Sequence, residues 1–204
     1  MINSLAISDI VLAFASLFAV FLMAQVKQFP ALYKTSSIAA FTGFLLMGLA
    51  SVVGSLHYGI SPIWTPYHKI LTELAMLLSP PLVAIALSLI LCADSWTKRR
   101  WFFLIAAIIA FYSISRHFDA GELYCNIQLS ILLLFITVQM IRAKIEPMPH
   151  VILWSSIIIY FLGGIVIGNE GTLMGYLRLE MFRYIMGLGN LLLGTAMFMV
   201  LTKK

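Results

Sequence analysis

Side chains that can bind a metal or move a proton gather in two short segments of this sequence. The segment "SLHYGISPIWTPYHKILTELAM" (55–76) holds two histidines and a glutamate, and "RHFDAGEL" (116–123) holds a histidine, an aspartate and a glutamate. Imidazole and carboxylate groups that converge from different helices are ligands for divalent metal ions. The candidate metal ligands are therefore His57, His68, Glu73, His117, Asp119 and Glu122.

The spacing of these residues matches no catalytic motif. The sequence contains no H-x-x-x-H or H-E-x-x-H pair, so a divalent metal is a candidate cofactor without a supporting motif. Ser55 and His57 are two positions apart, which points them apart on a continuing helix and does not favour a nucleophile and its base. Catalytic residues are left unassigned. Because there is no phosphate-binding loop, no dinucleotide fingerprint and no lysine inside the last apolar run, we expect neither a nucleotide nor retinal.

The elements that position these residues are apolar runs. The chain is 62% hydrophobic and 10% charged, whereas soluble domains carry roughly 25% charged residues. A run of about 20 apolar residues crosses the ~30 Å hydrocarbon layer of a bilayer as a helix. The sequence predicts one all-α domain over 1–204, a bundle of seven transmembrane helices. The predicted spans are about 5–26, 36–56, 70–92, 101–117, 122–142, 151–168 and 181–202.

The distribution of lysine and arginine predicts the orientation. Nine of the 13 basic residues fall on the side of the loops at 26–35, 93–100 and 143–150 and of the C-terminal tail, and four fall on the other side. The positive-inside rule then places the amino terminus outside and the carboxyl terminus in the cytoplasm. The compact loops are typical of a bacterial inner membrane protein. The basic residues form no continuous stripe, so we expect no nucleic-acid partner and take membrane lipids as the surroundings.

Polar side chains are concentrated towards the outer side of the predicted spans. Arg183, Gly187, Asn190 and Gly194 follow one helical face of the last span, and a charge within a span must pair, snorkel or reach water. We interpret this asymmetry as an outward-facing polar vestibule that narrows towards the middle of the membrane. The predicted lining residues are Ser51, Ser55, Asn126, Arg183, Gly187 and Asn190.

Prolines and glycines mark two further features of the spans. Pro80 and Pro81 free the carbonyl groups of Met76 and Leu77, which then need a partner from another helix, a water or a ligand. Gly164 and Gly168 form a G-x-x-x-G pair, a pattern that favours close packing of helices. The same pair is a candidate contact for a membrane-protein partner.

Part of the sequence resembles a known family. The stretch "GSLH" (54–57), followed by a loop and "HKILTELAMLLS" (68–79), resembles the second and third helices of alkaline ceramidases. These belong to a seven-helix hydrolase superfamily that includes the progestin and adipoQ receptors. The resemblance implies a seven-helix fold with an outside amino terminus, in which Ser55 and His57 correspond to a serine and a histidine of helix two and "TELAM" (72–76) to the motif of helix three.

The sequence departs from that family at the residues that bind zinc. The family's serine and histidine lie four positions apart instead of two, and Thr72 occupies the position of its aspartate. The last run, "MFRYIMGLGN" (181–190), has no histidine where the family has H-x-x-x-H. The resemblance therefore supports the fold more than a zinc hydrolase.

Three functions follow as hypotheses from these observations. The first is a non-enzymatic receptor, sensor or membrane-complex subunit built around the vestibule. The second is a lipid-directed membrane hydrolase, with a metal if the candidate ligands converge. The third is a transporter of a small solute or ion, which the polar residues within the spans and the Pro80/Pro81 pair would suit.

Overall fold

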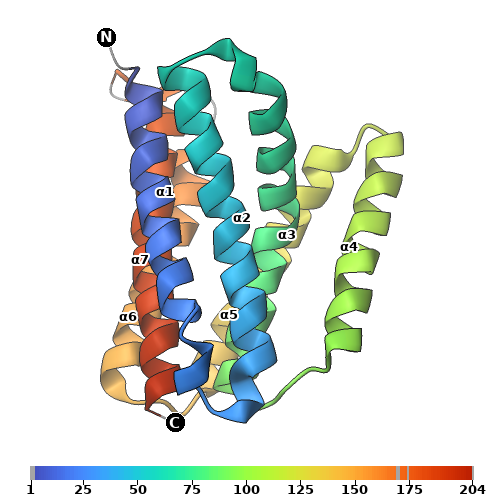
Figure 1. Ribbon diagram of the computed structural model, residues 1–204, viewed down its shortest axis with the longest axis vertical. Coiled ribbons are helices and arrows are strands. Elements are labelled where there is room, and N and C mark those ends of the chain that lie inside the picture. The colour runs from blue at the N-terminus through green and yellow to red at the C-terminus, as the bar shows by residue number, and fades with distance from the viewer. Residues whose placement is uncertain (1–2, 169–170, 174, 204) are drawn as a thin grey trace.

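The computed structural model describes residues 3–168, 171–173 and 175–203, and it is a bundle of long helices (Figure 1). Lys204, one of the basic residues counted for the orientation, lies outside the described residues. Each predicted apolar run coincides, to within a few residues, with one helix or with a helix and its extension, so the positions of the helices were predicted correctly. The helices are α1 (Ser4–Met23), α2 (Lys34–Gly59), α3 (Thr65–Leu91), α4 (Lys98–His117), α5 (Gly121–Arg142), α6 (Pro147–Phe161) and α7 (Arg178–Thr202).

Six helical segments of the described chain are long and apolar enough to cross a membrane, and α4 is not among them. These six support an integral, multi-pass membrane protein. The amino terminus and the carboxyl terminus lie at opposite ends of the bundle (Figure 1). We call the end at which α1 begins the outer end, and the end at which α7 finishes the inner end.

Helices α2 and α3 extend further at the outer end than the sequence predicted. Helix α2 continues to Gly59, and after a 3-10 turn (η3, Pro62–Trp64) α3 begins at Thr65, with Pro66 in its first turn. The predicted limits at 56 and 70 are too short because hydropathy reports where a helix is apolar, whereas the backbone hydrogen bonds continue through polar residues. Two more 3-10 turns, η1 (Val26–Gln28) and η2 (Ala31–Tyr33), join α1 to α2.

The predicted glycine pair of the sixth span does not form a packing face. Helix α6 passes into a π-helix, η4 (Leu162–Ile167), which ends at Gly168 with a φ of +64°. Gly168 donates its N–H to the carbonyl of Gly163 at 3.0 Å and terminates the helix. Gly163, rather than Gly164, packs against Ile185 of α7. The helix does not continue through the second glycine, so the pair joins no two helices of the described chain, and its contact with a partner protein stays a prediction.

A short hairpin precedes the last helix and was not predicted. Strands β1 (Thr172–Leu173) and β2 (Tyr176–Leu177) pair antiparallel, with Thr172 opposite Leu177. Gly175 lies in the connection with a φ of +86°, a conformation that glycine adopts at little cost. Arg178 at the start of α7 donates its backbone N–H to the carbonyl of Gly171 at 3.0 Å, which closes this link.

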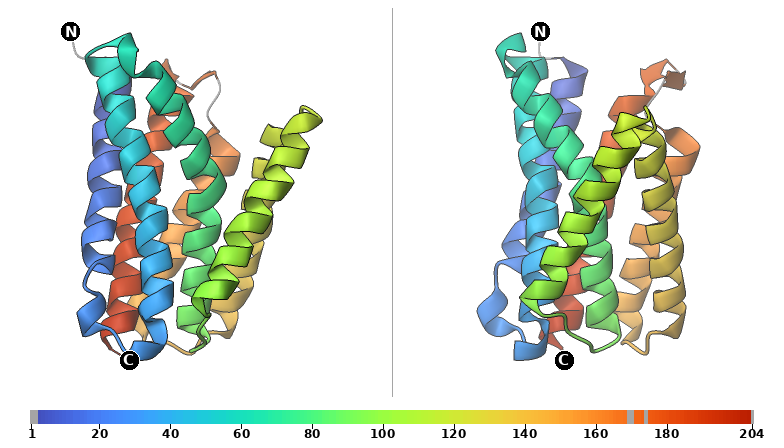
Figure 2. Two further views of the ribbon diagram at one scale, coloured as in Figure 1. Left: turned by 45° about the vertical axis from the view of Figure 1, so that its right-hand side comes forward. Right: turned by 90° about the vertical axis from the view of Figure 1, so that its right-hand side faces the viewer.

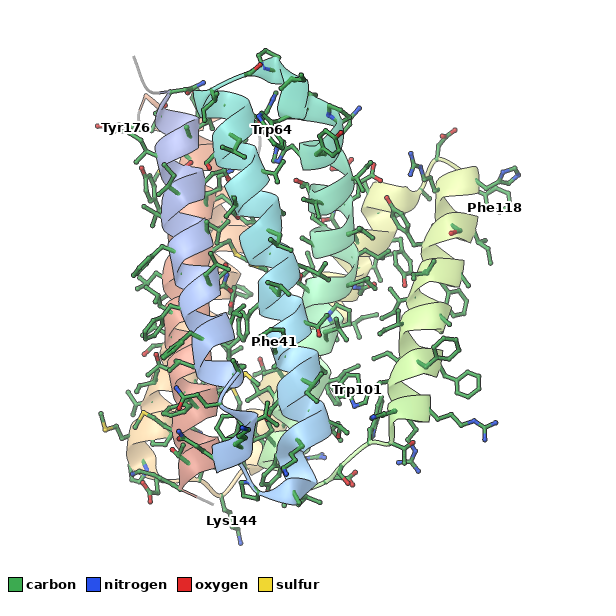
Figure 3. All side chains as sticks on the ribbon, in the orientation of Figure 1. Phe41, Trp64, Trp101, Phe118, Lys144 and Tyr176 are labelled. Carbon is green, nitrogen blue, oxygen red and sulfur yellow. The ribbon has the colours of Figure 1, made fainter. Side chains whose placement is uncertain are left out.

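The bundle has a compact body and one outlying helix. The apolar core lies at the contact of α1, α2, α3 and α7 and is continued by α5 and α6, with Phe44, Leu87, Met140 and Met197 almost completely buried. Helix α4 stands to one side of this body in Figure 1 and in the left view of Figure 2, and it touches mainly α3 and α5. Trp101 points from its inner end towards the body, whereas Phe118 follows its other end and points away (Figure 3).

Candidate functional site

Five side chains from four helices meet at the outer end of the body, and we call them the outer polar cluster. They are Asp9 of α1, His57 and Tyr58 of α2, His68 of α3 and Arg183 of α7. The unpredicted extensions of α2 and α3 are what bring His57 and His68 to this position.

A buried ion pair between the first and last helices lies at the centre of the cluster. Nη1 of Arg183 lies 3.1 Å from Oδ2 of Asp9, and the two side chains are only 8% and 3% exposed. The same Nη1 donates to the carbonyl of Leu5 at 3.2 Å, and the guanidinium lies over the ring of Tyr58, 4.9 Å from its centroid. A charge at this depth is tolerable only when paired, and Arg183 has an anion, a carbonyl and an aromatic face.

Gly54 makes room for this arrangement. A Cβ atom at position 54 would lie 2.5 Å from Oδ2 of Asp9 and 3.0 Å from Cε1 of His68. The first distance is shorter than a carbon atom allows and the second is tighter than an ordinary contact, so a side chain at position 54 would displace the carboxylate and crowd the imidazole. Gly54 is a part of the site that sequence reasoning missed, because a glycine inside a helix gives no sign of what lies opposite it.

The two histidines stack on each other beside the ion pair. Their ring centroids are 5.4 Å apart, and the ring of Tyr58 lies 4.6 Å from that of His57 and 5.5 Å from that of His68. Nδ1 of His57 lies 3.2 Å from the hydroxyl of Thr65, and Nδ1 of His68 lies 3.3 Å from the hydroxyl of Thr72. One ring nitrogen of each histidine therefore has a hydroxyl partner on α3.

A second polar network lies deeper, where the sequence placed Asn190 in mid-membrane. The Asn190 side chain is fully buried; its amide nitrogen donates to the hydroxyl of Ser16 and to the sulfur of Met47, both at 2.8 Å. Its oxygen accepts from the hydroxyl of Tyr160 at 2.5 Å. Asn190 thus links α7 to α1, α2 and α6, the role of an interhelical hydrogen-bonding residue. At the outer end, Ser4 donates to the Glu180 carboxylate and links α1 to α7 again.

The candidate metal ligands lie in separate places. His57 and His68 are together in the outer polar cluster, whereas Glu73 forms an exposed ion pair with Arg116 of α4 at 3.3 Å. His117, Asp119 and Glu122 are exposed around the turn between α4 and α5. Among the described residues there is no group of three or more His, Cys, Asp or Glu side chains placed to hold one metal ion.

The residues predicted to line the vestibule differ in burial. Ser51, Arg183, Gly187 and Asn190 are buried, Ser55 is partly buried, and Asn126 is exposed on α5. The hydroxyls of Ser51 and Ser55 donate to carbonyls of their own helix, those of Met47 and Val52. Arg183 and Asn190 have partners on other helices. The vestibule itself stays a prediction.

Comparison with known proteins finds no matching family model, no matching curated protein and no matching solved structure. Function is therefore inferred from geometry. The outer polar cluster holds opposite charges and ring systems in contact with one another, an arrangement suited to fixing four helices in one relative position.

The proline pair of α3 also acquires a partner. Gln128 of α5 donates its side-chain N–H to the carbonyl of Leu77 at 2.9 Å, the carbonyl that Pro81 frees. The sequence-based expectation that a freed carbonyl needs a partner from another helix is confirmed for Leu77. Helix α3 continues from Thr65 to Leu91 through both prolines.

This contact predicts a coupling between Gln128 and Pro81. We expect Gln128→Leu to lower the free energy of unfolding by about 1 kcal/mol, in the range of interhelical hydrogen bonds in membranes. In a Pro81→Ala background the same substitution is expected to cost less, because residue 81 then supplies an N–H to Leu77. Unfolding in detergent micelles, followed by circular dichroism for the four proteins of the cycle, measures this coupling. An equal cost in both backgrounds would assign the effect to packing alone.

Proposed function

We propose that this protein is a non-enzymatic subunit of a membrane complex and that α4 is the helix its partner covers. The observation that carries the proposal is the mismatch between α4 and a bilayer. Basic residues occupy both ends of α4, so its apolar stretch between Arg100 and Arg116 is residues 101–115. At 1.5 Å per residue this stretch is roughly 23 Å long, shorter than the ~30 Å hydrocarbon layer. A short apolar stretch is accommodated by thinning the bilayer, by snorkelling or by association with other helices.

The packing of α4 favours association. Only Trp101 and Ile108 of this helix are buried, and large apolar side chains cover the rest of its surface, including Phe102, Phe103 and Phe111. Helix association in membranes depends on van der Waals packing and hydrogen bonds rather than on removal of water. Helices α3 and α5 pack against one side of α4 only. A transmembrane helix of a partner would pack against the other side.

The proposal includes the topology. We propose that α4 spans the membrane with the other six helices, which gives seven spans, an outside amino terminus and a cytoplasmic carboxyl terminus. The positions of the termini at opposite ends of the bundle support an odd number of spans (Figure 1). The basic residues at the inner end support this orientation and a plasma-type membrane, which we propose to be a bacterial inner membrane.

The geometry supports a subunit better than the two alternatives. A hydrolase needs its acids, bases and metal ligands around one centre, and the candidates are divided among the outer polar cluster, the Glu73–Arg116 pair and the α4–α5 turn. The pairing of His57 with His68 is the observation that favours a hydrolase. A transporter needs polar groups that contact the solute on its way through the membrane. The polar groups proposed for that role, those of Asn190 and Arg183 and the Leu77 carbonyl, have partners within the protein.

Photo-crosslinking from two surface phenylalanines tests the proposal. Phe111 of α4 and Phe14 of α1 are both apolar and exposed, at 61% and 68%. With p-benzoylphenylalanine at either position in the native membrane, we expect position 111 to give a discrete protein adduct and position 14 to give none. Mass spectrometry identifies the protein in the adduct. An adduct that also forms in the purified protein is a crosslink between two copies of this chain. Indistinguishable products at the two positions would contradict the proposal.

A further inference from the structure

An apolar groove runs between α5 and α6 on the side of the body away from the outer polar cluster. Its volume is about 440 Å³, within the roughly 300–1,000 Å³ typical of sites for small ligands. Leu133 and Leu134 of α5 line one wall, and Trp154, Ile158 and Phe161 of α6 line the other. The groove exists because α5 packs mainly on α3 and α6 packs mainly on α7, so the two consecutive helices have few contacts with each other.

The lining of the groove is apolar. Its two hydroxyl side chains, Ser130 and Thr137, both donate within α5, to the carbonyls of Asn126 at 2.9 Å and of Leu133 at 2.7 Å. With these donors used, the lining offers methyl, methylene and aromatic contacts along the length of two helices. Its shape and chemistry suit a single hydrocarbon chain.

The inner end of the same helix pair is basic. Helix α5 ends at Arg142, and the four-residue link to α6 carries Lys144, which points away from the bundle (Figure 3). The ring of His150 stacks over that of Trp154, a residue of the groove wall, with centroids 6.3 Å apart. The one acid here, Glu146, is paired with Lys203. Net positive charge therefore lies below a hydrocarbon groove, which complements an anionic lipid headgroup.

We propose that the α5–α6 groove binds one acyl chain of an anionic phospholipid, whose phosphate lies beside Arg142 and Lys144 at the inner end. The site uses a different surface from α4, so it stands independently of the proposed role as a complex subunit. The lipid would fill the space between two helices that the chain itself leaves apart.

Trp154 is a built-in reporter for this site. In a variant with Trp64→Phe, Trp96→Phe and Trp101→Phe, Trp154 is the one tryptophan left of the four in the chain. The variant is reconstituted in phosphatidylcholine vesicles that contain a minor fraction of phospholipid brominated on its acyl chains, with either a phosphatidylglycerol or a phosphatidylcholine headgroup. Bromine quenches an indole on contact. We expect the phosphatidylglycerol to reach the same quenching as the phosphatidylcholine at a roughly fivefold lower mole fraction. Fivefold is about the enrichment of an anionic lipid that one basic residue near the membrane surface produces.

Two matched variants separate the headgroup from the chain. Arg142→Gln with Lys144→Gln is expected to remove the preference for phosphatidylglycerol and to leave quenching by phosphatidylcholine. Thr137→Phe fills the groove and is expected to reduce quenching by both lipids, whereas Ile131→Phe, on the same helix outside the lining, is expected to change neither. Native mass spectrometry of the unmodified chain, which should retain phosphatidylglycerol over phosphatidylcholine, does not depend on the tryptophan substitutions.

Three results would overturn the lipid site. Equal quenching by the two headgroups, with equal retention in mass spectrometry, would remove the anionic specificity. Unchanged quenching in Thr137→Phe would show that the chain does not enter the groove. Quenching that falls as the protein-to-lipid ratio rises would assign the groove to a second copy of this protein.

Discussion

Asp9→Asn is expected to destabilise the folded protein by about 3–5 kcal/mol, the typical cost of removing one partner of a buried ion pair. The substitution keeps the size of the side chain and removes the charge that faces Arg183 at 3.1 Å. The guanidinium then stays buried with a carbonyl and an aromatic ring but no anion. Chemical unfolding in detergent micelles, followed by circular dichroism at neutral pH, measures the change in the free energy of unfolding.

The protein offers a matched control for this prediction. Glu73→Gln removes the same kind of charge from the Glu73–Arg116 pair, whose side chains are 45% and 65% exposed. An exposed pair contributes about 0–1 kcal/mol, so this variant should unfold almost like the parent. The double variant Asp9→Leu/Arg183→Met removes both buried charges and should recover most of the lost stability. If Asp9→Asn costs no more than Glu73→Gln, the buried pair does not hold α1 to α7.

The sequence predicted which residues of α7 share one face, because this pattern depends on the periodicity of a single helix. Arg183, Gly187, Asn190 and Gly194 share a helical face by spacing, and that face meets α1 along its length. Arg183 meets Asp9, Gly187 lies against Leu12 and Ala15, Asn190 contacts Ser16, and Gly194 lies against Ala19. Helical periodicity predicts which side chains point inward together, and it did so here.

The contacts between elements could not be read from the sequence in the same way. Periodicity does not state which helix a face meets, so the pairing of Asp9 with Arg183 across 174 positions had no local signal. His57 and His68 lie together because α2 and α3 continue past the ends of their apolar runs. His117 lies apart from them because it is at the end of α4. The vestibule stays a prediction for a related reason: serine, asparagine and arginine inside a span serve equally to line water and to join helices.

The close contact between α1 and α7 also depends on the absence of a side chain at Gly194. A Cβ atom there would lie 2.6 Å from Cβ and 3.0 Å from Cα of Ala19, and the second of these atoms belongs to the backbone of α1. Neither helix can move aside locally, because Asn190 ties them together one turn away through Ser16. A methyl group at position 194 must therefore separate α1 from α7.

Gly194→Ala is expected to lower the free energy of unfolding by about 1–3 kcal/mol, the usual cost of overpacking, despite the gain in helix propensity. Gly164→Ala is the control, because a Cβ atom at position 164 meets nothing within 4 Å. That variant should be neutral or stabilised by up to about 1 kcal/mol, so the same chemical change is expected to have opposite signs at two glycines of one protein. Ala19→Gly in the Gly194→Ala background restores the space and should recover the loss. Unfolding in micelles that gives equal effects at 164 and 194 would mean that α1 and α7 do not approach at Gly194.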